Sequence, residues 1–118
     1  MVSMLKPSST NIENEEVLEI DCPFMLTLRF IGKRWKPAVL WKINEGHNRF
    51  KDLKMQLPGI SDKMLSASVS ELTRDGILEK QVSHEGTRIK VEYRLTDFGQ
   101  TLLPVLAQMN KWGNSNLK

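Results

Sequence analysis

A change of hydrophobic period in the middle of the chain restricts the fold more than any other feature of these 118 residues. Up to Gly76, apolar residues recur at the three- and four-residue spacing of helices. The segments "ILEKQVS" and "IKVEYRLT" then alternate apolar with polar residues, as strands with one buried face do. Between them, "HEGTR" supplies a glycine-containing hairpin loop. The pattern indicates a mainly α fold with a small β-hairpin, in the α+β class.

Proline and glycine mark the boundaries of the expected helices. A helix over 23–31 stops at Gly32, a second lies in "KPAVLWKINEG", and a third, short one lies in "RFKDLKMQL". After the breaker "PGIS", a fourth helix is expected over 62–75. Thr96 can cap a last helix over 97–112 that is kinked at Pro104 and ends at Gly113. Two short helices joined by a tight turn and followed by a hairpin predict a winged helix-turn-helix.

The fourth helix separates its apolar residues from its polar ones. At about 100° per residue, Leu65, Val69 and Leu72 fall on one face. The other face and its flank are small, polar and basic: Lys63, Ser66, Ala67, Ser70 and Arg74. Such a face fits the major groove of DNA. An ordinary surface helix has a similar pattern, so the interpretation depends on the rest of the motif.

Further basic and polar residues fall where the motif would contact a DNA backbone. The hairpin carries His84, Thr87, Arg88 and Lys90, and Arg49 and Lys51 stand at the start of the third helix. Ser61, the expected N-cap, is placed for a phosphate at a helix N-terminus. The predicted partner is therefore double-stranded DNA.

Charge is divided unevenly along the chain. Residues 1–21 hold one basic and five acidic side chains, a net of −4, whereas residues 22–118 hold sixteen basic and nine acidic ones, a net of +7. A basic domain attracts polyanions. We expect a mobile acidic arm over 1–20, a DNA-binding domain over 21–113, and a tail over 114–118.

Other functional classes find little support in the sequence. No phosphate-binding glycine loop, serine elbow or zinc-binding His-Glu-x-x-His motif is present, so we expect neither an enzyme nor a cofactor. His47 and His84 lie in predicted loops without nearby ligands, and no metal site is expected. A single cysteine excludes an internal disulfide, and no membrane span or secretory signal is recognisable. A cytoplasmic protein is the expectation.

Several segments in order resemble the HxlR-type family of bacterial winged helix-turn-helix regulators, relatives of the MarR-type regulators. They are "GKRW", "RFKDL", "LPGIS.KML", "L..DGILEK", "VEYRLT.FG" and "LLPVL", within residues 21–113. The resemblance implies a homodimer built by the first and last helices, which binds an inverted-repeat operator. It places these residues at the dimer interface: Phe24, Leu28, Leu102, Leu106, Met109 and Trp112.

Cys22, in "DCPF", has two interpretations. Free cysteines are usually small buried apolar residues. A helix N-terminus favours a thiolate, however, whereas the adjacent Asp21 disfavours it. In the family that the chain resembles, a cysteine before this proline recurs, and in a subset it senses electrophiles or oxidants. The resolving thiol would then be Cys22 of the other subunit or a small thiol.

The sequence thus predicts a homodimeric DNA-binding transcription regulator, with modification of Cys22 as a candidate switch. Two alternatives stay open. One is a winged-helix module that binds a protein partner, and the other is a regulator that responds to a small effector while Cys22 is silent.

Overall fold

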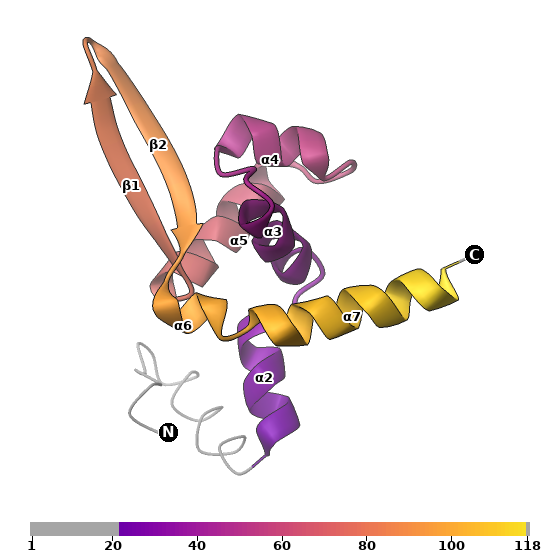
Figure 1. Cartoon of the computed structure of the whole chain (residues 1–118). Coiled ribbons are helices and arrows are strands. Elements are labelled where there is room, and N and C mark those ends of the chain that lie inside the picture. Colours follow the sequence, from indigo (N-terminus) through magenta and orange to yellow (C-terminus); the bar gives the residue numbers. More distant parts are fainter. Residues whose placement is uncertain (1–21, 118) are drawn as a thin grey trace. The chain divides into compact units, whose positions relative to one another are not determined.

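The chain divides into two compact units, residues 1–32 and Lys33–Lys118. The computed structural model describes residues 22–117, so the predicted acidic arm lies outside the described residues. In the first unit, α2 (Pro23–Ile31) begins with Cys22 as its N-cap and Pro23 in its first turn, and ends at Gly32 (Figure 1). These bounds confirm the helix expected over 23–31. A Cβ atom on Gly32 would lie 2.2 Å from the Leu28 carbonyl oxygen, which explains the glycine at this end.

The second unit holds the helices and the hairpin in the predicted order. Its elements are α3 (Lys36–Asn44), α4 (Phe50–Gln56), α5 (Asp62–Arg74), β1 (Leu78–Glu85), β2 (Arg88–Leu95), α6 (Asp97–Gln100) and α7 (Leu103–Asn116). The short helices α4 and α5, the turn between them and the antiparallel β1–β2 pair form a winged helix-turn-helix (Figure 1). None of the described helices has the length and apolar content needed to cross a membrane.

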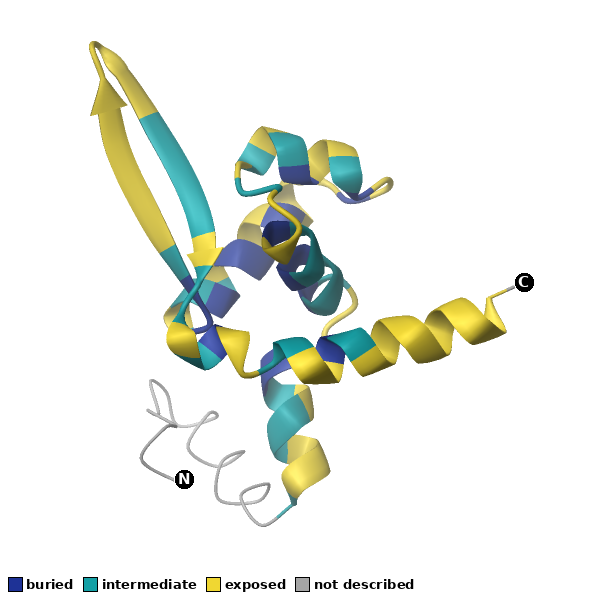
Figure 2. Ribbon diagram, viewed as in Figure 1, coloured by how far each residue is buried: buried dark blue, intermediate teal, exposed yellow. Residues whose placement is uncertain are grey.

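The core of this unit lies where α3, α4, α5 and the base of the hairpin meet (Figure 2). Its fully buried side chains come from each of these elements: Val39, Leu40, Leu53, Leu65, Leu72, Ile77 and Leu78. Complete burial of one such side chain stabilises a fold by about 1.5–3 kcal/mol. The hydrophobic contacts of α5 therefore fix its position between α3, α4 and β1.

A buried ion pair also joins α3 to α5. The Lys36 side chain starts in the first turn of α3, and this residue is only 2% exposed. Its Nζ atom lies 3.2 Å from Glu71 Oε1 on α5, and Lys33 Nζ lies 3.8 Å from the same oxygen. A buried ammonium group needs such a partner, because an unpaired charge in the interior is strongly unfavourable.

The hairpin turn is tighter than the sequence suggested. Pairing continues to Glu85 and Arg88, so only Gly86 and Thr87 form the loop of "HEGTR". Gly86 has a φ of 63°, in the left-handed region that two-residue hairpin turns assign to glycine.

Burial of one hairpin face extends only along its base, which corrects the expectation of two half-buried strands. Ile77 and Leu78 are buried, but β1 is exposed from Lys80 onward, and Val82 and Ile89 face solvent. The hairpin extends away from the helices of its own unit, so its outer half has no core to cover it (Figure 2). The alternating apolar residues of this outer half contact each other across the strands, as Val82 does with its pairing partner Val91.

Hydrogen bonds at its base hold the hairpin in place. The Thr96 backbone N–H donates to the Ile77 carbonyl (3.0 Å), and its hydroxyl donates to the Gly76 carbonyl (2.5 Å). Further along β2, the Tyr93 N–H donates to the Asn48 carbonyl at 2.9 Å. These bonds tie the hairpin to the C-terminus of α5 and to the segment before α4.

The C-terminal region is two helices, not the single kinked helix that we expected. Thr96 caps α6 by accepting from the Gly99 N–H at 3.0 Å, but the chain turns at Thr101 and Leu102 before α7 begins. Pro104 lies in the first turn of α7, where its missing N–H costs no helical hydrogen bond.

Gly113 does not end α7, which continues to Asn116. Side chains in this last turn bond back to the helix: the Ser115 hydroxyl to the Lys111 carbonyl (3.0 Å) and the Asn116 amide to the Trp112 carbonyl (2.9 Å).

Gly99 provides a test of this packing. A Cβ atom at this position would lie 2.2 Å from the Ile77 carbonyl oxygen, so Gly99→Ala must displace backbone. We expect a loss of about 1–3 kcal/mol in the free energy of unfolding, measured by urea denaturation. Gln100→Ala, at the exposed neighbouring position, is the control and should change it by less than about 0.5 kcal/mol. Equal stability of the two variants would contradict the close approach.

Candidate nucleic-acid interface

One face of α5 is fixed in the core and the other is open. Ser61 caps the helix as predicted, because its Oγ atom accepts from the Met64 backbone N–H at 3.1 Å. The predicted inward residues Leu65, Val69 and Leu72 are buried, and the structure adds Ser68 to this face. The predicted outward residues are all exposed: Lys63, Ser66, Ala67, Ser70 and Arg74. This face is small and basic, as entry into a major groove requires.

The start of α4 and the hairpin together form a basic hollow. Arg49, the N-cap of α4, lines an open hollow of about 280 Å³ with Glu85, Arg88, Ile89 and Lys90. The two segments are far apart in the sequence, and their meeting here brings three cationic groups to one place. Such a hollow suits an anionic group such as a backbone phosphate.

Lys90 already has anionic neighbours within the hairpin. Its Nζ atom lies 3.6 Å from Glu85 Oε1 and 3.8 Å from Glu92 Oε2. Glu92 also accepts from the Asn48 side-chain amide at 3.3 Å. The lysine is therefore positioned before any ligand arrives, and it can exchange an exposed carboxylate for a phosphate at small energetic cost.

The predicted wing residues do not form one cluster. His84 lies opposite Ile89 in the pairing, whereas Glu85 lies opposite Arg88. Because successive strand residues point to opposite faces, His84 shares a face with Ile89, and Arg88 and Lys90 lie on the other. Thr87 is in the turn and exposed. In the structure, the basic cluster consists of Arg88, Lys90 and Arg49, and His84 lies on the opposite face of the hairpin.

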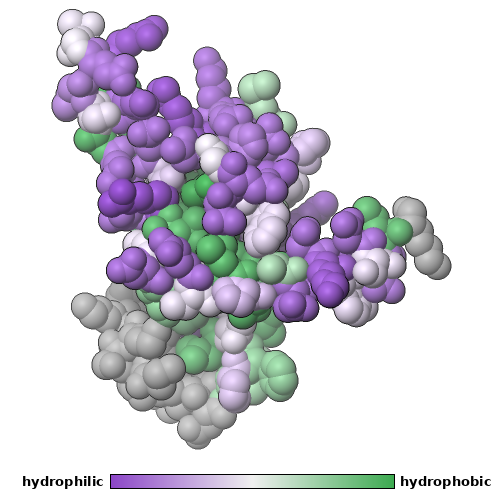
Figure 3. Space-filling view, viewed as in Figure 1, coloured by the Kyte–Doolittle hydropathy of each residue, from purple (hydrophilic) through white to green (hydrophobic). Residues whose placement is uncertain are grey.

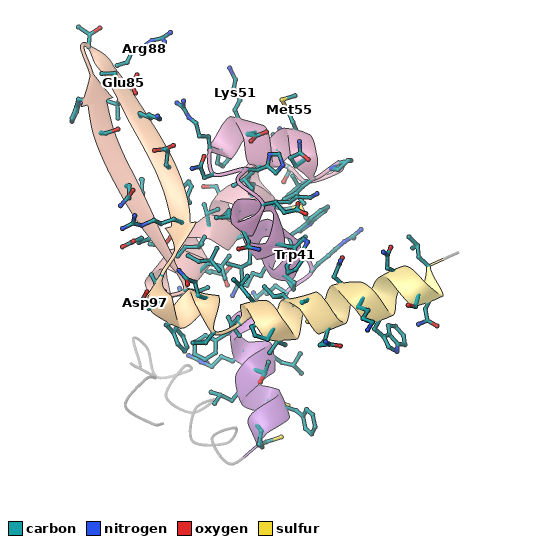
Figure 4. All side chains as sticks on the ribbon, in the orientation of Figure 1. Trp41, Lys51, Met55, Glu85, Arg88 and Asp97 are labelled. Atoms are coloured by element: carbon teal, nitrogen blue, oxygen red, sulfur yellow. The ribbon has the colours of Figure 1, made fainter. Side chains whose placement is uncertain are left out.

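Met55 on α4 was not among the predicted site residues, whereas its neighbour Lys51 was. Lys51 and Met55 project side by side from α4, on the same side as the hairpin tip with Glu85 and Arg88 (Figure 4). Met55 is 77% exposed. Met55 comes two residues after the buried Leu53, which places it about 200° around the helix, on the opposite face. This spacing alone would have predicted that the Met55 side chain is exposed to solvent.

The candidate dimer residues differ in accessibility. On α2, Phe24 is 80% exposed and Leu28 is also exposed. On α7, Met109 and Trp112 are exposed, and Leu102, the N-cap residue before α7, is half-buried. Leu106 is only 3% exposed, so it belongs to the interior and offers little surface to a partner. Leu106 faces α3, because it lines an open hollow of about 450 Å³ together with Trp41 of that helix.

Cys22 is a free thiol of intermediate exposure at the N-cap of α2. Its carbonyl accepts from the Leu26 N–H at 3.0 Å, and its side chain makes no capping hydrogen bond. The thiol is therefore not committed to the cap.

His47, one of the two histidines of the chain, has a structural partner. His47 Nδ1 lies 2.8 Å from Asp52 Oδ2, which links the loop after α3 to α4.

Burial raises the pKa of the Tyr93 hydroxyl above its ordinary value, so this group is neutral at the pH of DNA binding. Among residues 22–117, no group of three or more His, Cys, Asp or Glu side chains could hold a metal ion.

Comparison with known proteins agrees with this architecture. The model of the HxlR-like helix-turn-helix family matches residues 30–118. The HTH-type transcriptional regulator YybR of Bacillus subtilis (strain 168) is 41% identical over 95 residues, which cover 80% of this chain and 75% of YybR.

Solved structures of two redox or transcriptional regulators are also similar. The redox regulator HypR in its oxidized form is 40% identical, with a TM-score of 0.77 over 82% of this chain and 99% of that chain. Reduced YodB of B. subtilis is 36% identical, with a TM-score of 0.68 over 82% of this chain and 95% of that chain. The chain therefore belongs to the HxlR-like helix-turn-helix family, whose relatives are transcription regulators and not enzymes.

Proposed function

We propose that two copies of this chain bind an inverted-repeat operator in double-stranded DNA, with α5 in the major groove and the β1–β2 hairpin on the flanking backbone. The observation that carries the proposal is the open face of α5, which is small and basic while the opposite face is buried in the core. A helix held in this way can present its residues to base edges without leaving the fold.

Each group in the interface has a chemical task under this proposal. Lys63, in the first turn of α5, contacts a base acceptor or a phosphate, and the hydroxyls of Ser66 and Ser70 bond to base edges. Six other predicted contacts hold phosphates and set the register: Arg49, Lys51, Ser61, Arg74, Arg88 and Lys90. A phosphate in the hollow beside Arg49 would displace Glu85 from Lys90.

Binding to a protein partner is the competing interpretation of the same face. Protein interfaces are enriched in aromatic residues and Met at their centre and depleted in Lys. The outward face of α5 carries Lys63, Ser66, Ala67 and Ser70, and Met64 at its edge, 39% exposed, is the one large apolar side chain that α5 exposes. This composition favours DNA.

Removal of one cation from α5 or the hairpin should weaken DNA binding. The DNA that flanks the chain's own gene supplies a probe, and fluorescence anisotropy at several salt concentrations measures the affinity. Lys63→Ala and Arg88→Ala should each cost about 1–3 kcal/mol and reduce the slope of log affinity against log salt by about one for each lost phosphate contact. Lys111→Ala, an exposed cation on α7, is the matched control. Full affinity in both test variants would place the DNA on another surface.

The dimer is proposed to use the exposed apolar residues of α2 and α7. Phe24 and Leu28 are one helical turn apart, and Met109 and Trp112 are similarly spaced on α7. Exposed apolar side chains at such spacing are typical of helix–helix interfaces. A two-fold dimer would carry two copies of α5, which an inverted repeat requires.

A charge in the proposed interface should separate the subunits. Trp112 is 72% exposed in the single chain, so Trp112→Glu should fold normally but bury an unpaired carboxylate in a dimer. Sedimentation velocity should show a monomer, with weaker binding to the full operator. Val82→Glu, at an exposed apolar position of the hairpin, should remain dimeric. A dimeric Trp112→Glu protein would exclude α7 from the interface.

We propose that Cys22 is the switch. Its thiol is free, partly exposed and placed at the start of a proposed dimer helix. The similar redox regulator HypR has been solved in oxidized and reduced forms, and YodB in reduced and diamide-treated forms, which supports a thiol-based signal for this chain. Modification of Cys22 would shift α2, change the angle between the subunits and move both α5 helices relative to their half-sites.

Diamide tests the switch. Two Cys22 thiols, one from each subunit, would give up two protons and two electrons to the azo bond of diamide, which yields one disulfide and one hydrazine. We expect treated protein to differ from reduced protein in operator affinity by about tenfold, and dithiothreitol to reverse the change. Cys22→Ser should bind DNA and lose the response. An unchanged affinity after complete modification of Cys22 would refute the switch without affecting DNA binding.

A further inference from the structure

We propose that Met55 of α4 contacts the 5-methyl group of a thymine at the edge of each half-site and so contributes to operator choice. The inference rests on the proposed DNA binding and adds an apolar contact outside α5. Met55 is 77% exposed, although it belongs to a short helix whose Leu53 has no exposed surface. Single exposed apolar side chains are common on protein surfaces, so the partner of Met55 has to be inferred from the groups around it.

The surroundings of Met55 indicate where that partner lies. Met55 lines an open hollow of about 540 Å³ with Phe50, Lys51, Lys54 and Asp62. Asp62 is the first residue of α5, so the hollow adjoins the end of the helix that enters the groove. A small apolar group beside hydrophilic side chains is visible at the edge of the molecule in this region (Figure 3).

Charge makes DNA the favoured occupant. Lys51 projects beside Met55 on the side of the hairpin tip (Figure 4). Lys54 pairs with Asp62 through its Nζ atom, which neutralises the acidic group nearest to the hollow. A two-fold contact whose axis passes through this patch would bring the two Lys51 ammonium groups close together, which is unfavourable. A polyanion with an apolar group fits best.

Major-groove chemistry identifies the apolar group. Base edges in that groove present hydrogen-bond donors and acceptors, and the thymine methyl is the apolar exception. A methionine thioether is flexible and polarisable, so it can pack on such a methyl from the rim of the groove. Because Met55 carries no charge, its contact should be specific to sequence and insensitive to salt.

A coupled substitution of protein and DNA tests the contact. The operator is first located by footprinting, and each thymine of the half-site is then replaced by deoxyuridine, which lacks the methyl. For the unaltered protein, one thymine in each half-site should matter, with about a fourfold loss of affinity on replacement, the factor expected for one buried methyl group. Met55→Ala should lose affinity for the thymine operator and show no further loss on the deoxyuridine operator. Met55→Leu should restore most of the sensitivity.

Lys51→Ala is the matched control on the same helix. It should weaken binding to every sequence and reduce the salt slope, whereas Met55→Ala should leave the slope unchanged. Full operator affinity in Met55→Ala, or equal deoxyuridine losses in both proteins, would overturn the contact. A changed sedimentation coefficient in Met55→Ala would instead assign the patch to a second copy and also overturn it. A failure of the proposed function is recognised separately, because the unaltered protein would then bind no DNA in the first step.

Discussion

The burial of one face of α5 is the constraint on which the proposed DNA-binding surface depends. Leu65 and Leu72 have no exposed surface, and α5 packs against α3, α4 and β1. The ion pair between Lys36 and Glu71 also joins α5 to α3, and it gives the buried Lys36 ammonium group an anionic partner. With its inner face held in this way, α5 cannot rotate without opening the core. Its outer face is therefore presented in a fixed direction.

The position of the hairpin follows from a second set of contacts, made by backbone groups and small side chains. Thr96 links the end of β2 to Gly76 and Ile77, and the Asn48 carbonyl holds Tyr93. Because Asn48 directly precedes Arg49, the same contact brings the N-cap of α4 to the cationic side of the hairpin. The basic hollow is thus a consequence of tertiary structure, and its members are separated by almost forty residues of sequence.

Local pattern was sufficient to predict the order of the elements and the inward face of α5. Helical period, proline at helix starts and glycine at ends act within a few residues, and the structure follows them from Pro23 to Arg74. Features that depend on tertiary contacts were missed. Pro104 begins a new helix because the chain turns at Leu102, and Leu106 is buried although the family resemblance placed it at the dimer interface. His84 and Arg88 point to opposite sides because the strands extend to a two-residue turn.

The central claim is that two α5 helices occupy two major-groove segments of one operator. Methylation of guanine N7, which lies in the major groove, reports this directly when the bound DNA is treated with dimethyl sulfate. Our account predicts two protected segments related by a two-fold axis, with centres about one helical turn, or a whole multiple of one turn, apart. A single protected segment, or bound DNA whose guanines all stay reactive, would contradict it.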